Sequence, residues 1–156
     1  MKIPRDFVEM LAVFADAGVR YMIVGGYAVG LHARPRTTKD IDVWLASDRD
    51  NITKACAALR RFGAPPDIVE ALRTATADEI VWMGHAPLRV DFLQSIDGVT
   101  FGPAWSRHVD ITVDGVPTHV IGRKDLIDNK KAAGRPRDRQ DIRALEPSKR
   151  PTRRRQ

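Results

Sequence analysis

The segment Asp40–Leu45 alternates acidic and apolar side chains at its start, and this alternation constrains the fold more than any other feature of the chain. In a β-strand, residues i and i+2 point to the same face, about 6.6 Å apart along the chain. Asp40 and Asp42 would therefore share one face, while Ile41 and Val43 point into a core. Two carboxylates about 6 Å apart repel each other by roughly 3 kcal/mol at an effective dielectric near 20. A cation such as Mg²⁺ would offset this repulsion, and a solvated strand face is the alternative interpretation.

The rest of the chain alternates between helical and extended patterns. Phe7, Leu11 and Phe14 follow helical spacing, and Asp114-Gly115 is typical of a type I′ turn between two strands. We expect an α/β (α+β) protein with one mixed sheet of about five to six strands flanked by helices. The expected strands are 21–24, 40–45, 79–83, 88–93, 109–113 and 116–121, and the expected helices lie between Pro4 and Gly18 and at 27–32, 48–62, 67–76, 123–133 and 138–145.

The length and the charge distribution of the chain limit how it can be divided into domains. Its 156 residues, 43% hydrophobic and 29% charged, indicate a single globular domain, which we place at residues 1–146. Residues 122–156 contain 13 Lys and Arg against 5 Asp and Glu, a balance of +8 that exceeds the net charge of +6 of the whole chain. We expect residues 147–156 to form a disordered basic tail. A positive end of this kind attracts phosphate groups.

The sequence also argues against several classes of protein. No apolar stretch approaches the roughly 18 residues that a transmembrane helix needs, and the N-terminal segment lacks the apolar core of a signal peptide, so a cytoplasmic protein is expected. Cys56 is the single cysteine, which excludes an internal disulfide and a cysteine-based zinc cluster. The histidines show no metal-ligand spacing and are assigned no role: His32, His85, His108 and His119.

A third carboxylate stands in the middle of another apolar strand. Asp91 lies between Val90 and Phe92, and a charged residue in such a position needs a partner. An ion pair with Arg89 or Arg36 is one explanation. If this strand lies beside Asp40–Leu45, three carboxylates meet and could hold two Mg²⁺ ions for phosphoryl transfer.

A glycine pair adds a feature of phosphate-binding turns. Gly25-Gly26 follows the expected strand 21–24 and opens a helix. Such a turn lets backbone N–H groups approach a phosphate, and the helix N-terminus adds the positive end of its dipole. A plain turn is the alternative for this pair.

Together these motifs resemble the nucleotidyltransferase superfamily that includes DNA polymerase beta. Its pattern is a Gly-Gly or Gly-Ser turn, a later Asp-x-Asp pair and then a single acid on a strand, matched here by Gly25-Gly26, Asp40-Ile41-Asp42 and Asp91. Arg36 and Thr38 complete the Arg-x-Thr-x-Asp-Ile-Asp motif of a small prokaryotic branch, which includes toxin-type enzymes of abortive-infection and toxin–antitoxin systems. The segment 125–142 is similar to the Lys…Gly-Arg-Pro-x-Asp-x-x-Asp segment of that branch.

The resemblance assigns roles to the matching positions. Asp40, Asp42 and Asp91 would be the catalytic acids and would hold two Mg²⁺ ions, with Mn²⁺ as a substitute. The nucleotide-binding positions would be Gly25, Gly26, Arg36, Thr38 and Lys130. Lys130 follows Leu126 and Ile127 on the inner side of its expected helix, whereas Lys131 should face water.

The expected activity is Mg²⁺-dependent transfer of a nucleoside monophosphate from an NTP, such as ATP, to a hydroxyl. The basic C-terminal end favours RNA, for example tRNA, as the acceptor, and the resemblance implies a toxin–antitoxin setting with an antitoxin partner. A protein hydroxyl and a small antibiotic remain alternatives. A catalytically silent nucleic-acid-binding module on the same fold is the second hypothesis. A phosphatase of the haloacid dehalogenase type also uses Asp-x-Asp, but Val43-Trp44-Leu45 supplies neither the Thr nor the Gly that it needs.

Overall fold

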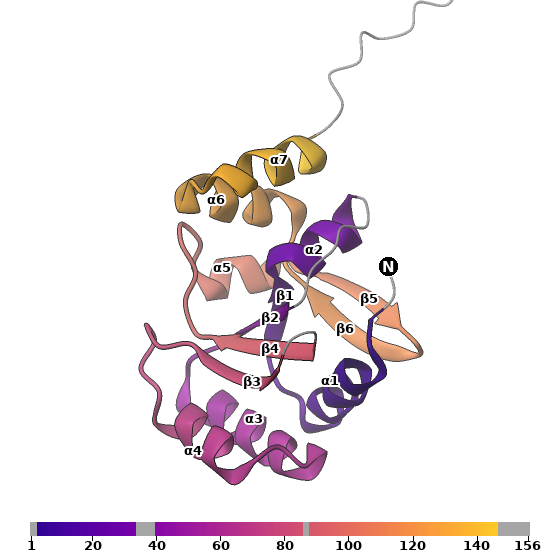
Figure 1. Ribbon diagram of the computed structural model, residues 1–156, viewed down its shortest axis with the longest axis vertical. Helices are drawn as coiled ribbons and strands as arrows, with labels where there is room; N and C mark the ends of the chain where they lie inside the picture. Colours follow the sequence, from indigo (N-terminus) through magenta and orange to yellow (C-terminus); the bar gives the residue numbers. More distant parts are fainter. Residues whose placement is uncertain (1–2, 34–39, 86–87, 147–156) are drawn as a thin grey trace, which may run out of the picture.

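A mixed sheet lies between two groups of helices in the structure, a computed structural model that describes residues 3–33, 40–85 and 88–146 (Figure 1). Within these residues the strands are β1 (Tyr21–Val24), β2 (Asp40–Leu45), β3 (Val81–His85), β4 (Leu88–Leu93), β5 (Val109–Val113) and β6 (Val116–Val120). The helices are α1 (Arg5–Ala17), α2 (Gly25–His32), α3 (Arg49–Phe62), α4 (Pro66–Thr74), α5 (Phe101–Ser106), α6 (Arg123–Ala133) and α7 (Pro136–Leu145). The expected α/β class and strand number are confirmed.

The strands follow the order β3-β4-β2-β1-β6-β5 across the sheet. β2 runs parallel to β4 and β1 runs parallel to β6, while the remaining neighbours are antiparallel. The parallel pair β2–β4 is important for function because it joins the two acidic strands that are separated in sequence by α3 and α4.

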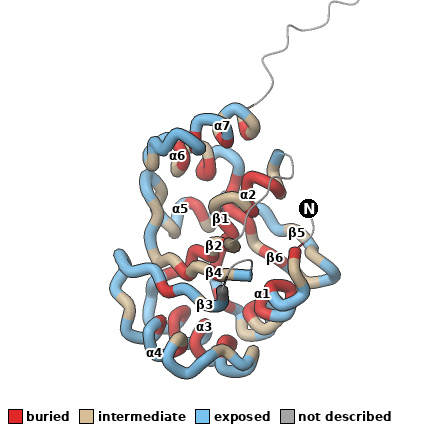
Figure 2. The backbone as a smooth tube through the Cα atoms, in the orientation of Figure 1, coloured by how far each residue is buried: buried red, intermediate tan, exposed pale blue. Residues whose placement is uncertain are grey.

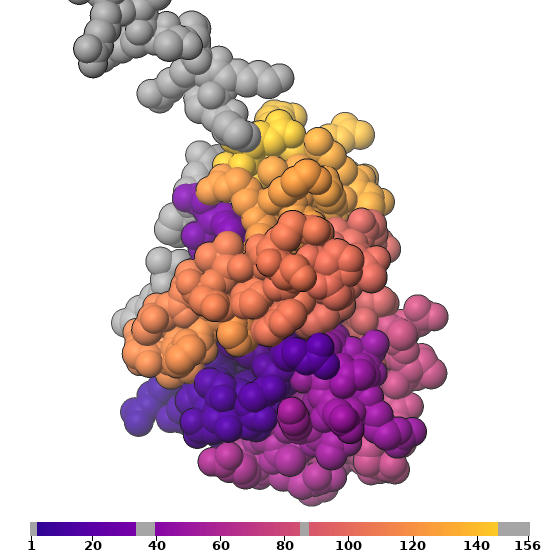
Figure 3. Space-filling model, turned by 180° about the vertical axis from the view of Figure 1, so that it is seen from behind, coloured from indigo at the N-terminus to yellow at the C-terminus, as the bar shows by residue number. Residues whose placement is uncertain are grey.

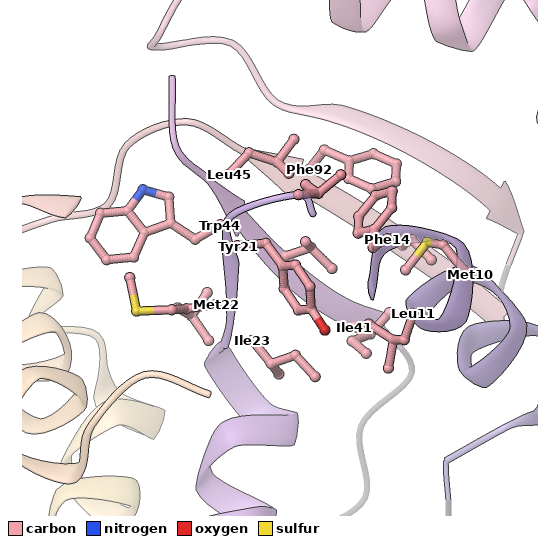
Figure 4. Packing of buried hydrophobic residues seen from close by; sticks show 14 of the residues in the cluster. Met10, Leu11, Phe14, Tyr21, Met22, Ile23, Ile41, Trp44, Leu45 and Phe92 are labelled. Carbon is pink, nitrogen blue, oxygen red and sulfur yellow. The ribbon is translucent and has the colours of Figure 1, made fainter. Parts of the chain in front are cut away.

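The two faces of the sheet are covered by different helices. Phe14 of α1 packs against Phe92 of β4, with ring centroids 6.3 Å apart, and α3 and α4 continue this layer. On the opposite face, Trp44 of β2 meets Phe101 of α5 edge to face at 5.0 Å. Figure 4 shows Phe14 and Phe92 close together and Trp44 pointing away from them.

Burial follows the alternation in β2. Ile41 and Val43 are fully buried, whereas Asp40 and Asp42 on the other face are half-buried. Figure 2 shows buried positions along β1 and β2 at the centre and exposed positions on the outer sides of α4 and α7. The carboxylates therefore project from a strand whose other face is fixed in the hydrophobic core.

Some details differ from the sequence-based expectation. α2 begins at Gly25, two residues earlier than expected, and β3 is shifted two residues toward the C-terminus. The short helix α5 was not expected because Gly102 and Pro103 are poor helix formers, and its packing against Trp44 compensates for that weak propensity. Asp114 and Gly115 both have positive φ, which confirms the type I′ turn. Within the described ranges, every helix is too short or too polar to cross a bilayer.

Candidate active site

The parallel pairing of β2 and β4 brings the predicted carboxylates together. Asp42 lies directly opposite Asp91, and Asp40 lies opposite Arg89. Residues paired across a sheet point to the same face, so the three carboxylates share the face that α5 covers farther along β2. This arrangement was predicted on the condition that the two strands are neighbours, and the structure meets that condition.

Gly25 lies beside Asp42 on the side of β1. Asp42 pairs with Val24, the last residue of β1, and Gly25 follows at the start of α2 with a φ of +67°. A Cβ atom on Gly25 would lie 2.1 Å from Oδ2 of Asp42, far inside van der Waals contact. Glycine is thus required here both for its backbone conformation and for the close approach of the carboxylate.

Asp42 experiences the strongest electrostatic effect at the site. Burial raises its pKa, the neighbouring Asp91 and Asp40 raise it further, and Lys130 and Arg135 oppose these effects only in part, so that the pKa is about 7. A cation placed between Asp42 and Asp91 would stabilise the charged form of both carboxylates. Three carboxylates on one face supply the oxygen ligands that Mg²⁺ prefers, so this donor set fits the expected metal.

Asp91 also has a cationic partner. Nε of Arg89 donates to Oδ1 of Asp91 at 2.7 Å, and the Asp91 side chain is only 15% exposed. The guanidinium of Arg89 in turn lies 5.2 Å from the ring centroid of Trp82 on the edge strand β3. The ion pair that the sequence offered as an alternative explanation is therefore present together with the carboxylate cluster.

Lys130 lies on the inner side of α6, as expected from its spacing. Its side chain is 4% exposed, and Nζ lies 3.1 Å from Oδ1 of Asp138 and 3.0 Å from Oδ2 of Asp141. Burial alone would raise the pKa of Asp138, but hydrogen bonds from Arg135 and Lys130 outweigh it and lower the pKa to about 2. These buried ion pairs join α6 to α7 and account for an inward-facing lysine.

We expect Lys130→Ala and Lys131→Ala to have very different effects on stability. Loss of Lys130 leaves the buried carboxylates of Asp138 and Asp141 without their shared cation, which should cost about 3 kcal/mol of unfolding free energy. Lys131 is 59% exposed and lies 3.6 Å from Glu146, so its loss should stay within about 0.5 kcal/mol. Urea unfolding at neutral pH measures both values, and equal losses would contradict the assignment of Lys130 as the buried partner.

A cavity of about 480 Å³ opens in front of the carboxylates. Asp40, Asp42, Asp91 and Gly25 contribute to its lining, and two further groups of charged residues complete it. Basic side chains come from α6, α7 and the turn between them: Lys130, Arg135 and Arg137. Acidic side chains come from the segments before β3 and after β4: Asp78, Glu79 and Asp97. The lining of the cavity thus combines basic and acidic side chains around the carboxylate cluster.

Some predicted residues stand apart from this group. Gly26 lies in the first turn of α2 and is not among the lining residues of the cavity. Arg36 and Thr38 lie outside the described residues, as does the tail at 147–156. Asp78, Glu79 and Asp97 were not singled out from the sequence, because charged residues in turns carry no periodic signal that would place them in a cavity.

The histidines were assigned no role from their spacing in the sequence, but the fold brings two of them together with a carboxylate. The β5–β6 hairpin brings His108 and His119 together with Asp110, so that one ligand atom of each lies within 4.8 Å of the others. A type I′ turn pairs residues across a hairpin, so the spacing of Asp110 and His119 around Asp114-Gly115 was the signal that could have found them.

Residues 6–150 match the model of a protein family described as "Nucleotidyltransferase of unknown function (DUF6036)". The match spans nearly all of α1 to α7 and includes all three carboxylates. The chain belongs to this nucleotidyltransferase family. It is accordingly a nucleotidyltransferase, a transferase of phosphorus-containing groups, and the resemblance read from the motifs is confirmed. A search of curated protein sequences gives no significant match.

Several solved structures share the fold of this chain. The nucleotidyltransferase is similar to ANT(2″)-Ia in complex with adenylyl-2″-tobramycin, with a TM-score of 0.58, 16% identity, and coverage of 89% of this chain and 84% of that chain. It is similar to the lincomycin-bound lincosamide antibiotic adenylyltransferase LnuA, with a TM-score of 0.61, 14% identity, and coverage of 92% and 96%. An antigenic nucleotidyltransferase-like protein from Paracoccidioides brasiliensis gives a TM-score of 0.53 at 11% identity and coverage of 93% and 78%. At these identities the comparisons show a shared fold.

Proposed function

We propose that this nucleotidyltransferase transfers a nucleoside monophosphate from an NTP to a hydroxyl of an acceptor and releases pyrophosphate. The meeting of Asp40, Asp42 and Asp91 at the mouth of one cavity carries the proposal. Asp42 and Asp91 lie opposite each other at a cost in repulsion that a cation would remove, which is the arrangement expected of a metal-dependent site.

The three carboxylates would hold two Mg²⁺ ions, and Mn²⁺ could replace them because it has the same preference for oxygen ligands. Bound there, the ions would supply positive charge to the triphosphate and to the attacking oxygen. Asp91 would act as the third ligand or as the base for the acceptor hydroxyl. The raised pKa of Asp42 implies that it releases a proton when the metal binds.

The remaining groups would position the nucleotide. The backbone N–H groups at the start of α2, from Gly25 and Gly26, would face the triphosphate with the positive end of the helix dipole behind them. Lys130 and Arg135 line the same cavity and would add positive charge, although Asp138 and Asp141 already neutralise part of it. By sequence, Arg36 and Thr38 are further candidates for nucleotide contacts. Catalysis then depends mainly on positioning and charge stabilisation.

Two classes of acceptor have support. The balance of +8 in residues 122–156 favours RNA, which would fit a toxin–antitoxin setting with an antitoxin as partner. The acidic residues that also line the cavity, Asp78, Glu79 and Asp97, instead favour a small acceptor that carries amino groups beside its hydroxyls. The structural neighbours with bound adenylyl-2″-tobramycin and lincomycin are consistent with the second class.

A labelling experiment tests the activity and the acceptor together. The full chain is incubated with each NTP labelled at the α-phosphate, with and without Mg²⁺, and with either total cellular RNA or a panel of amino-bearing small alcohols. We expect Mg²⁺-dependent label in one acceptor class, resolved by gel for RNA or by chromatography for small molecules.

A protein that binds RNA but labels no acceptor with any NTP would support the catalytically silent nucleic-acid-binding module instead. Calorimetric titration with ATP and Mg²⁺ on the same preparation then shows whether the nucleotide is bound at all. Absence of both label and nucleotide binding would contradict the proposed function.

A further inference from the structure

The β5–β6 hairpin carries a polar cluster that the proposed transfer reaction does not use. His108 immediately precedes β5, Asp110 lies on β5, and His119 lies directly opposite Asp110 on β6. Figure 3 shows this segment, coloured salmon to orange, exposed as a band across the middle of the molecule. The cluster is therefore open to ions from solvent.

One carboxylate oxygen contacts both imidazole rings. Oδ1 of Asp110 lies 2.7 Å from Nε2 of His108 and 2.5 Å from Nδ1 of His119. The side chains of His108 and His119 are 16% and 26% exposed, whereas that of Asp110 is 68% exposed. The rings are held within the protein, and the carboxylate lies on the solvent side.

The contact made by Nδ1 of His108 determines whether Nε2 of the same ring carries a proton. Nδ1 of His108 contacts the backbone carbonyl oxygen of Trp105, which can only accept a hydrogen bond, so Nδ1 carries the proton. In a neutral ring, Nε2 then presents a lone pair toward a carboxylate oxygen of Asp110. Two acceptors at this distance require a positive charge between them, either a second proton on the ring or a metal ion.

Packing fixes the rings in this orientation. The ring of Trp105 on α5 stacks on His108, with centroids 4.0 Å apart and planes 19° apart, and meets His119 edge to face at 5.0 Å. The ring of Tyr21 lies 5.3 Å from that of His119 on another side. A ligating histidine typically donates its other N–H to a backbone carbonyl, and His108 has that contact already.

We propose that His108, Asp110 and His119 form a transition-metal site, with Zn²⁺ as the expected ion and water as the fourth ligand. Two imidazole nitrogens and a carboxylate oxygen are the donor set of Zn²⁺, whereas Mg²⁺ prefers oxygen ligands alone. Ligands of a tetrahedral zinc stand roughly 3.3 Å apart, whereas Oδ1 of Asp110 lies 2.7 Å and 2.5 Å from the two ring nitrogens, so Asp110 must move outward for an ion to enter. Its exposure allows that movement.

This site is separate from the carboxylate cluster. Asp42 lies opposite Val24 at the end of β1, whereas the His119 ring lies against Tyr21 at the beginning of that strand. A bound ion would fasten the end of α5 to β5, the edge strand of the sheet. Its effect should therefore appear as stabilisation of the fold.

Cobalt and zinc titrations of the full chain test the proposal. After removal of metals with a chelator, Co²⁺ should give visible absorption bands of a four-coordinate site at one ion per chain, and Zn²⁺ should displace it. Zn²⁺ should also raise the melting temperature of the wild-type protein. His119→Gln and Asp110→Asn should each weaken Co²⁺ binding at least about tenfold and abolish the shift in melting temperature.

Two control variants locate the ion. Asp114→Asn alters a carboxylate at the turn of the same hairpin, where asparagine tolerates positive φ, and should bind Co²⁺ as the wild type does. Asp42→Asn should also keep the signal. His119→Gln is first shown to be folded by circular dichroism. If it keeps both the Co²⁺ spectrum and the zinc-induced shift in melting temperature, or if the wild type shows neither, the proposal is wrong. The cluster is then held by hydrogen bonds alone.

Discussion

Asp42→Asn should reduce nucleotidyl transfer at least about a thousandfold, equivalent to about 4 kcal/mol in the transition-state free energy. The substitution removes a charged metal ligand while leaving the shape of the side chain nearly unchanged. Steady-state labelling of the acceptor at saturating Mg²⁺ measures the loss. Retention of full activity would contradict the role of the carboxylate pair.

The same variant should be more stable than the wild type at alkaline pH. The pKa of Asp42 is about 7 in the folded protein, against an ordinary value of 3.8, so between these pH values the folded state holds a proton that the unfolded chain has released. The wild-type free energy of unfolding therefore falls as pH rises through this window, and the fall is complete above about pH 7. Without metal, the variant should gain on the order of 1–3 kcal/mol at about pH 8 and little near pH 4.

Asp128→Asn is the matched control for this measurement. Asp128 is an exposed carboxylate that pairs with Lys124 on α6, away from the cluster. Its loss should leave the difference from the wild type nearly constant across the pH range. Parallel stability curves for Asp42→Asn and the wild type would instead show that Asp42 is not under electrostatic strain.

Gly25→Ala should lower activity by several hundredfold while costing only about 1 kcal/mol of stability. The new Cβ would lie 2.1 Å from Oδ2 of Asp42, so the carboxylate must move out of its present position. The end of a side chain can move at low energetic cost, but the metal ligand then leaves its position. Activity and urea unfolding are measured on the same preparation.

Gly18→Ala separates backbone strain from this contact. Gly18 has a φ of +68°, almost the same as the +67° of Gly25, and a Cβ there would meet nothing within 4 Å. Both variants should therefore lose similar stability, but only Gly25→Ala should lose activity. Comparable activity in the two variants would mean that the close approach of Gly25 to Asp42 has no functional importance.

Local patterns in the sequence predicted most of the fold. The alternation of Asp40–Leu45, the helical spacing of Phe7, Leu11 and Phe14, and the Asp114-Gly115 turn each depend on neighbouring residues, and each predicted element is present. The short helix α5 escaped prediction because tertiary packing of Phe101 on Trp44 overrides a poor local propensity.

Prediction of the candidate site was limited by strand order. Each carboxylate was visible as a charge in an apolar strand, but only the parallel pairing of β2 with β4 places Asp42 opposite Asp91. The inward side of Lys130 was correctly predicted, whereas its partners Asp138 and Asp141 were not, because ion pairs between two helices depend on how the helices cross. The hairpin spacing could have paired Asp110 with His119, whereas the approach of His108 depends on tertiary contacts around the hairpin.

The register of β2 and β4 limits the substitutions that this protein can accept. Val43 lies opposite Phe92 in the hydrophobic core, one step along from Asp42 and Asp91 on the other face. A slip of one residue would turn Asp91 to the opposite face and bury its charge among apolar side chains. Core packing thus sets the alignment of the acidic residues. Substitutions at Val43 or Phe92 during evolution are therefore limited by the need to keep the carboxylates aligned as well as by stability, although neither side chain reaches the cavity.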